Sequence, residues 1–240
     1  MLTTILFDLD GTLLPIDEKP FLELYFGLMA RRFSALGFAP EPFIRAVWIG
    51  TEAMRKNAGP ATNEDVFWAA FGKAIPDGDG SIRAEFGRFY AEEFDHVQPS
   101  SSTHPLAREI LDVLHAKGYS VALATNPLFP RIATEKRIRW AGLIPEDFLF
   151  ITTYENSRAS KPASAYYEAV LDAVGKEASE CLMVGNDASE DMAAERLGIA
   201  TYLLTDCLIN AKNVDLDRFQ RGSFADLRRF VGALPDLIPR

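Results

Sequence analysis

Two acidic residues near the start of the chain, Asp8 and Asp10, directly follow the apolar run at residues 5–7. Side chains alternate between the two faces of a β-strand, so an extended segment here projects both carboxylates to one side and Leu9 to the other. At an effective dielectric constant of about 20, two such charges about 4 Å apart repel by about 4 kcal/mol. This is a large fraction of the net stability of a typical domain, so a partner must offset it.

Further polar residues follow other predicted strands, at the point where each strand ends. Thr125 and Asn126 follow one strand, Lys161 follows another after a loop, and a third is followed by Asn186, Asp187 and Asp191. Ligands of open parallel sheets bind at the carboxyl ends of the strands, so we expect these groups to meet in one crevice. Carboxylate and amide oxygens suit Mg²⁺, whereas hydroxyl, ammonium and backbone N–H groups suit phosphate. The sequence therefore predicts a site for Mg²⁺ and a phosphate group, in which the cation offsets the repulsion between Asp8 and Asp10.

The elements that position these residues alternate in a regular way. Apolar runs predict strands at residues 3–9, 119–125, 148–153, 181–185 and 200–205. Apolar residues at helical spacing predict helices from Pro105 to Gly118 and at residues 130–140, 163–174, 190–197 and 224–234. Near-continuous apolar strands that are separated by helices indicate a parallel sheet covered on both faces.

The stretch between the first predicted strand and Pro105 has a different pattern. Helical patterns occupy residues 18–38, 43–57, 62–74 and 81–95, and no strand signal interrupts them. We therefore expect two domains. Residues 1–14 and 104–240 form the sheet-containing core, and residues 15–103 form a helical cap.

Four short motifs resemble those of a known family. "DLDGT" at residues 8–12, "ATN" at 124–126, "KP" at 161–162 and "VGNDASED" at 184–191 resemble the four motifs of the haloacid dehalogenase-like (HAD) superfamily, in its order and at its spacing. The helical stretch resembles the α-helical cap that the family inserts just after the first motif. The resemblance implies an α/β fold: a Rossmann-like parallel-sheet core with helices on both faces, and an all-α cap domain.

The resemblance also implies a role for each matching residue. Asp8 would be the nucleophile that takes the phosphoryl group, and Asp10 would protonate the leaving alcohol and then deprotonate the attacking water. Lys161 would neutralise charge between Asp8 and the phosphoryl group. The phosphate oxygens would be held by Thr125, Asn126, Lys161 and the backbone at Leu9 and Gly11, and Thr125 also counts among the catalytic residues.

Mg²⁺ would bind Asp8, the Asp10 carbonyl oxygen and the fourth motif, where this sequence departs from the family. The family commonly has an Asp directly after the glycine of this motif, but here Asn186 stands there, followed by Asp187. Either the neutral Asn186 oxygen is a ligand and weakens Mg²⁺ binding, or Asp187 takes its place. Asp191 fits the second acid of the family motif, and we expect it to bond to a metal-bound water.

Each residue also has a simpler interpretation. An isolated Asp at a strand end commonly forms a turn or caps a helix, and an isolated Lys before Pro is commonly solvated. The joint occurrence of the motifs favours the catalytic interpretation. In the cap, Arg55 and Lys56 end a predicted helix and either contact the substrate or complement the helix dipole. Trp48, Trp68 and Trp140 are interpreted as packing residues.

Three functions remain open at this level. The first is a Mg²⁺-dependent phosphatase that hydrolyses a small phosphomonoester through an aspartyl phosphate. The second is a phosphomutase or another HAD-type hydrolase; the dehalogenases of the superfamily lack the second acid, so Asp10 disfavours that branch. The third is a protein without catalytic activity that binds a phosphorylated ligand.

The composition limits the partners that we expect. The 240 residues carry a net charge of −9 and include no basic tract, which disfavours nucleic acid as a partner. No apolar run is long enough to span a bilayer and no secretion signal is evident, so we expect a cytoplasmic protein that does not bind membranes. The two cysteines, Cys181 and Cys207, form neither a disulfide framework nor a zinc motif, and we expect both to be reduced.

Overall fold

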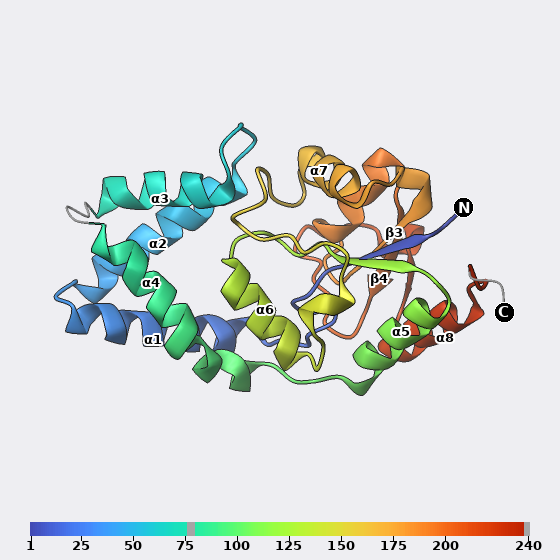
Figure 1. Cartoon of the computed structure of the whole chain (residues 1–240), viewed down its shortest axis with the longest axis horizontal. Helices are drawn as coiled ribbons and strands as arrows, with labels where there is room; N and C mark the ends of the chain where they lie inside the picture. Colours follow the sequence, from blue (N-terminus) through green and yellow to red (C-terminus); the bar gives the residue numbers. More distant parts are fainter. Residues whose placement is uncertain (76–79, 238–240) are drawn as a thin grey trace.

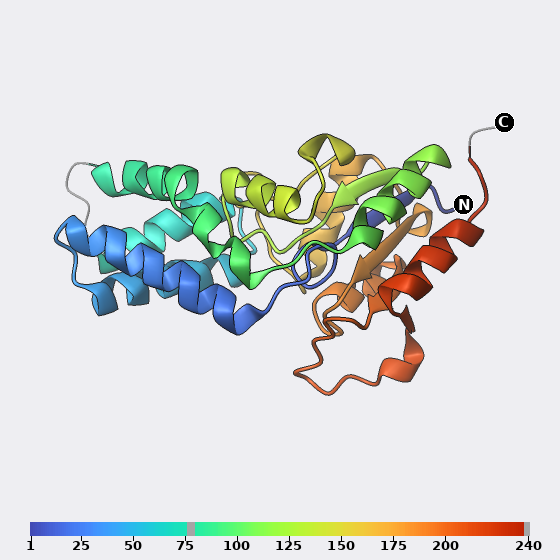
Figure 2. The same ribbon diagram turned by 90° about the horizontal axis from the view of Figure 1, so that it is seen from below.

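A computed structural model describes residues 1–75 and 80–237 of the chain. A parallel sheet and the helices that cover it form one part, and four helices that precede the second strand lie to one side of the sheet (Figure 1; Figure 2). None of the described helices is long and apolar enough to cross a membrane.

The sheet has five parallel strands in the order β2-β1-β3-β4-β5. Their bounds are β1 (Thr4–Phe7), β2 (Ser120–Leu123), β3 (Cys181–Gly185), β4 (Ala200–Leu204) and β5 (Gln220–Gly222). Strand β1 lies between β2 and β3, with Thr4 opposite Ser120 on one side and Cys181 on the other. All four residues of β1 are buried, which explains the apolar run before Asp8.

Helices cover both faces of this sheet. On one face, Ile5 and Phe7 belong to the same apolar cluster as residues of α5 (Pro105–Ala116) and α8 (Phe224–Ala233). On the other face, Leu6 packs in a separate cluster with residues of α7 (Ser164–Val174). Figure 1 shows α7 on one side of the strands and α5 with α8 on the opposite side. The predicted α/β fold, with a Rossmann-like sheet covered on both faces, is confirmed.

The helices beside the sheet are α1 (Glu18–Ala35), α2 (Pro40–Arg55), α3 (Asn63–Ala74) and α4 (Ser81–Glu92). Their shared core is rich in aromatic rings; Phe33 of α1 stacks on Phe43 of α2 with ring centroids 4.1 Å apart. Helices α2 and α3 pack closely at Gly50, where a Cβ atom would lie 2.5 Å from the Phe67 ring. Helix α6 (Arg131–Trp140) lies between this unit and the sheet (Figure 1).

Two chain segments connect the helical unit to the sheet, and they run side by side. Ile16 and Ser101 form an antiparallel bridge. The Asp17 N–H donates to the Ser100 carbonyl at 3.0 Å, and the Ser102 N–H donates to the Pro15 carbonyl at 3.0 Å. The two connecting segments lie at the predicted ends of the cap, residues 15 and 103. The division into two domains stays a prediction.

The segment at residues 148–153 is not the full strand that the sequence predicts. It runs beside β2 but forms a single parallel bridge, between Ile151 and Leu123. Its pairing ends where the Asn156 side chain, rather than a strand, accepts the Thr153 N–H at 2.8 Å. Leu149 is 61% exposed, whereas Ile151 and Thr153 are buried.

Two further local elements differ from the prediction. The predicted helix at residues 190–197 is a 3-10 helix, η4 (Asp191–Leu197). At its start, the Tyr167 hydroxyl donates to the Glu190 carbonyl at 2.5 Å and lies 3.3 Å from that of Asp191. Strand β5 was not predicted, because its three residues, Gln, Arg and Gly, carry no apolar pattern. The other 3-10 helices are η1 (Phe94–Ser100), η2 (Pro145–Asp147), η3 (Ala178–Glu180) and η5 (Leu216–Arg218).

Candidate active site

Asp8 and Lys161 form the centre of the candidate site. Asp8 follows the last residue of β1, and its backbone N–H donates to the Val184 carbonyl on β3 at 2.9 Å. The Lys161 Nζ lies 2.9 Å from Asp8 Oδ1 and 2.6 Å from Asp191 Oδ1, and the lysine is buried. Burial by itself would lower the pKa of Lys161, but the Asp191 and Asp8 carboxylates hold this pKa well above its ordinary value. Lys161 is therefore a fixed positive charge beside Asp8.

Thr12 connects Asp8 to the fourth motif. The Thr12 hydroxyl lies 2.9 Å from Asn186 Oδ1 and 3.2 Å from Asp8 Oδ2, so both oxygens compete for its proton. Gly11 makes this approach possible, since it adopts a φ of +80° and a Cβ atom there would lie 2.3 Å from Asn186 Nδ2. The Gly11 N–H, predicted to hold phosphate, donates within the turn to the Leu14 carbonyl at 2.8 Å.

Asn186 and Asp187, which the sequence left as alternative metal ligands, have different hydrogen-bond partners in the structure. Asn186 directs its oxygen to Thr12, beside Asp8, and its Nδ2 donates to the Cys207 carbonyl at 2.8 Å. Asp187 Oδ1 instead accepts the backbone N–H groups of Ser189 and Glu190 at 2.7 and 2.9 Å, so this carboxylate stabilises the following turn. Of the two, Asn186 is the residue that faces Asp8.

The oxygens near Asp8 suit a small, hard cation. They comprise the carboxylates of Asp8 and Asp191 and the neutral amide oxygen of Asn186. Within the described ranges there is no group of three or more His, Cys, Asp or Glu side chains that could hold a metal ion. All three donors are oxygens, which is the ligand type of Mg²⁺, so the residues fit this ion with less negative charge than three carboxylates would supply.

Asp10 is paired with Arg137, a residue that the sequence analysis did not single out. Arg137 lies on α6, is 1% exposed, and forms an ion pair through Nη1 with Asp10 Oδ2. Its guanidinium also lies 4.3 Å from the centre of the Phe129 ring. Asp10 Oδ1 is buried and has no hydrogen-bond partner among the described residues. Burial raises the pKa of Asp10, Arg137 opposes this rise and Asp8 adds to it.

The second motif is fixed by hydrogen bonds to its backbone and side chain. The Thr125 carbonyl accepts the hydroxyl groups of Thr152 and Tyr166 at 2.7 and 2.8 Å. Asn126 Nδ2 donates to Glu190 Oε2 at 2.8 Å, and in the described part of the chain its buried Oδ1 has no partner. The loop after β2 is thus rigidly placed beside the other motifs.

Sequence comparison agrees with this arrangement. The family model of haloacid dehalogenase-like hydrolases matches residues 2–198. The chain belongs to this family. Among curated relatives, this HAD-like hydrolase is 30% identical to the ribulose-1,5-bisphosphate 5-phosphatase of Halopiger xanaduensis, over 85% of this chain and 84% of the relative. It is 27% identical to the phosphoglycolate phosphatase of Pseudomonas fluorescens, over 84% of this chain and 68% of the relative.

Solved structures show the same fold. The HAD phosphatase from Thermococcus onnurineus matches with a TM-score of 0.62 at 19% identity and covers 98% of this chain and 100% of its own. The L-2-haloacid dehalogenase from Xanthobacter autotrophicus matches with a TM-score of 0.58 at 15% identity, again covering 98% and 100%. These two likenesses concern the fold alone.

The helical unit and the core of this HAD-like hydrolase meet at Glu190. Its Oε1 lies 2.9 Å from Arg55 Nη2 on α2, and its Oε2 accepts the amide of Asn126 from the core. Of Arg55 and Lys56, for which the sequence left open a contact with substrate or an interaction with the helix dipole, Arg55 lines the cavity between the helical unit and the motifs and is paired with Glu190. The side chain of Lys56 is 80% exposed and lies 3.9 Å from Glu52 on the outer surface.

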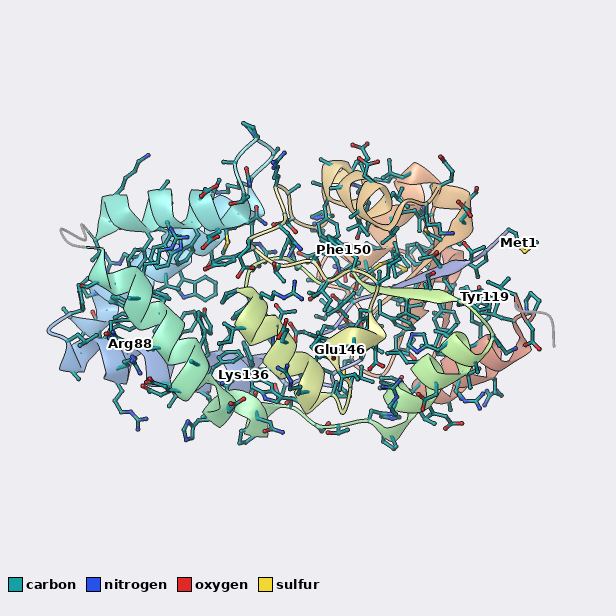
Figure 3. All side chains as sticks on the ribbon, viewed as in Figure 1. Met1, Arg88, Tyr119, Lys136, Glu146 and Phe150 are labelled. Carbon is teal, nitrogen blue, oxygen red and sulfur yellow. The ribbon has the colours of Figure 1, made fainter. Side chains whose placement is uncertain are left out.

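Helix α6 also joins the two parts. Lys136, labelled in Figure 3, lies 2.6 Å from Asp95 Oδ2 on η1 and donates to the Ala91 carbonyl at 2.8 Å. Trp140 donates its indole N–H to the other Asp95 oxygen at 3.1 Å. The helix that carries Arg137 is therefore held by the helical unit.

A cavity of about 590 Å³ lies between the helical unit and the motifs. Asp10, Gly11, Asn126 and Asn186 of the motifs line it, together with residues of α1 to α4, many of them aromatic, and further core residues such as Phe129 and Tyr154. Two of the predicted packing residues, Trp48 and Trp68, are part of this lining. The sequence held no signal for this role, because an aromatic residue on a helix is expected to pack.

Proposed function

We propose that this HAD-like hydrolase is a Mg²⁺-dependent phosphatase that hydrolyses a small phosphomonoester through an aspartyl phosphate on Asp8. The observation that carries the proposal is the position of Lys161, whose ammonium group lies between the carboxylates of Asp8 and Asp191 at the carboxyl end of β1. A cation fixed beside a buried carboxylate suits an attack on phosphorus, since the phosphoryl oxygens need neutralising charge. The names of the curated relatives support the same reaction class.

In the first step, Asp8 attacks the phosphorus atom and the bond to the leaving oxygen breaks, while Asp10 gives that oxygen a proton. In the second step, Asp10 takes a proton from water as the water attacks the aspartyl phosphate, which restores Asp8 and releases phosphate. Asp10 is suited to both steps for two reasons. It lines the cavity and its Oδ1 has no hydrogen-bond partner among the described residues. Its other oxygen, Oδ2, is held by Arg137. Lys161 keeps its charge throughout.

The metal would be held by Asp8, the Asp10 carbonyl oxygen and Asn186, with Asp191 bonded to a metal-bound water. When bound, Mg²⁺ neutralises the phosphoryl oxygens and the repulsion between the two acids. Asp187 is outside this set in our proposal, because its carboxylate is committed to the turn at Ser189 and Glu190.

The test is phosphate release from p-nitrophenyl phosphate and a panel of metabolite phosphomonoesters, with Mg²⁺ and with EDTA. We expect release that EDTA abolishes, and a fall in kcat of about 10³-fold or more for Asp8→Asn. Asp112→Asn, an exposed change on α5, is the matched control and should behave as wild type. Undiminished release by Asp8→Asn, or no release from any ester, contradicts the proposal.

We also propose that the protein acts in the cytoplasm on a small molecule and binds neither nucleic acid nor membranes. The net charge of −9 supports this, since phosphate backbones are usually bound by basic surfaces. The free thiols of Cys181 and Cys207 are consistent with a reducing compartment.

A further inference from the structure

We propose that the alcohol part of the substrate is an uncharged aromatic or similarly apolar group, and that the helical unit selects it by apolar contact. This inference rests on the proposed phosphatase function and names the substrate class of the same site. It sets this chain apart from its curated relatives, whose names specify an alcohol part with a carboxylate or a second phosphate.

The position of Asp10 determines which part of the substrate enters the cavity. Asp10 must lie beside the oxygen that leaves phosphorus, because it gives this oxygen its proton. Asp10 and Gly11 line the cavity, so the group attached to that oxygen occupies the space beside them. A volume of about 590 Å³ is within the usual range for small-molecule sites and has room for a ring-sized group.

The walls of this space are mainly apolar, and their aromatic residues come from both parts of the protein. The helical unit contributes Phe26, Trp48 and Tyr90, and the core contributes Phe129 and Tyr154. Several of these rings contact one another; Phe26 and Trp48 have centroids 5.1 Å apart, and Phe129 lies 5.6 Å from Tyr25. Rigid, touching rings form a wall that binds apolar surface and offers few hydrogen bonds.

The charges of the lining disfavour a second anionic group. Among the described residues that line the cavity, Arg55 is the one basic side chain, and its guanidinium is 2.9 Å from Glu190. Asp17 and Glu18 add negative charge to the lining beside that of Asp10. A carboxylate or second phosphate on the substrate would thus lose its hydration among aromatic rings and carboxylates without gaining a free cation.

The rim of the cavity is apolar on both sides. Trp48 on α2 is 42% exposed, and Leu208 and Ile209 on the core loop after β4 are 37% and 39% exposed. All three belong to the cavity lining. Exposed apolar side chains that gather at a cavity mouth are typical of a binding site, so the apolar surface that the substrate meets continues to the entrance.

Four esters of primary alcohols test the inference with leaving groups of similar reactivity: 2-phenylethyl phosphate, ethyl phosphate, phosphoglycolate and phosphocholine. We expect kcat/KM for 2-phenylethyl phosphate to exceed that for the other three by about tenfold or more. Trp48→Ala should lower the ratio of kcat/KM for 2-phenylethyl phosphate to that for ethyl phosphate. Ile49→Ala, its exposed neighbour on α2 that does not line the cavity, should leave this ratio unchanged. A higher kcat/KM for phosphoglycolate or for phosphocholine overturns the inference.

Binding of non-hydrolysable phosphonates separates this inference from the proposed reaction. Calorimetry should show tighter binding of 2-phenylethylphosphonate than of ethylphosphonate or phosphonoacetate, whether or not the esters are hydrolysed. If the phosphonates bind in this order but no ester is hydrolysed, the result contradicts the phosphatase function and supports the apolar site. Tighter binding of phosphonoacetate overturns the apolar site.

Discussion

The buried side chain of Arg137 forms an ion pair with Asp10 that joins α6 to the loop after β1. The pair occupies one oxygen of Asp10 and leaves the other without a partner among the described residues. Since Lys136 and Trp140 attach the same helix to Asp95 of η1, the orientation of Asp10 depends on contacts with the helical unit. Arg137 is thus a positioning residue for the proposed acid and base.

Arg137→Met should lower kcat much more than it changes KM. The change keeps an unbranched side chain over Phe129 but removes the guanidinium group that orients Asp10. General acid–base catalysis, which depends on this orientation, contributes about 10²–10⁴-fold to typical rates. We expect kcat to fall by about 10–100-fold, because Asp10 itself is retained. Steady-state kinetics with the best ester will measure this.

Arg137→Lys should recover part of the lost kcat, since it restores a positive charge without the planar guanidinium group. Arg139→Met, on the same helix and with its side chain 54% exposed, serves as the control for a lost surface charge. Wild-type kcat in Arg137→Met would show that Asp10 needs no such support.

Lys161→Met should destabilise the protein and abolish most of its activity. The change leaves Asp8 and Asp191 as buried carboxylates without their shared cation, and breaking a buried ion pair in this way costs about 3–5 kcal/mol. Urea unfolding will measure the free energy of unfolding, and phosphate release will measure the activity.

The double variant Lys161→Met/Asp191→Asn separates these two effects. It removes one of the two unpaired charges, so we expect it to regain part of the lost stability. Its kcat should stay low, because Asp8 still lacks its cation. A double variant that is no more stable than Lys161→Met would contradict the electrostatic explanation.

Asn186→Asp should lower the Mg²⁺ concentration needed for half-maximal activity by about five- to tenfold. It replaces a neutral ligand beside Asp8 by a charged one. Without Mg²⁺ the variant should be less stable by about 1–3 kcal/mol, since an aspartate cannot donate to the Cys207 carbonyl as Asn186 Nδ2 does. Thermal unfolding with and without Mg²⁺ reports the second effect independently of activity.

Asp187→Asn provides the comparison for Asn186→Asp. We expect it to leave the Mg²⁺ requirement unchanged and to weaken only the turn at Ser189 and Glu190. If Asp187→Asn raised the Mg²⁺ requirement as strongly as Asn186→Asp lowered it, our choice of Asn186 as the ligand would be wrong.

The sequence predicted the fold and the central charges because both depend on local patterns. Apolar runs that end in polar residues mark the carboxyl ends of parallel strands, where such sheets bind ligands. Asp8, Lys161 and Asp191 meet at this edge of the sheet. Arg137 could not be foreseen, since a basic residue on a helix is usually solvated and its burial follows from how α6 packs against the loop after β1. The aromatic cavity likewise depends on how the helical unit meets the core, which no local pattern encodes.

Helix α3 contacts the core at its first turn. The first N–H groups of this helix, at Asn63 and Glu64, donate to the carbonyls of Ser157 and Tyr154 at 2.8 and 2.9 Å, so the core supplies acceptors for a helix end. The Asn63 side chain is fully buried and donates to the Pro127 carbonyl at 3.0 Å. The contact therefore holds the cavity walls together beside the second motif.

Asn63→Ala should reduce the free energy of unfolding by about 1–3 kcal/mol and raise KM more than it lowers kcat, because the buried Pro127 carbonyl loses its donor and the cavity is less well formed. Thr62→Ala is the matched control. It removes the side-chain cap of the same helix, which accepts the Asp65 N–H at 3.1 Å, but leaves the contacts between Asn63 and the core in place. Thr62→Ala should cost about 1 kcal/mol without changing KM. Equal effects of both substitutions on KM would show that helix stability, rather than the contact with the core, shapes the site.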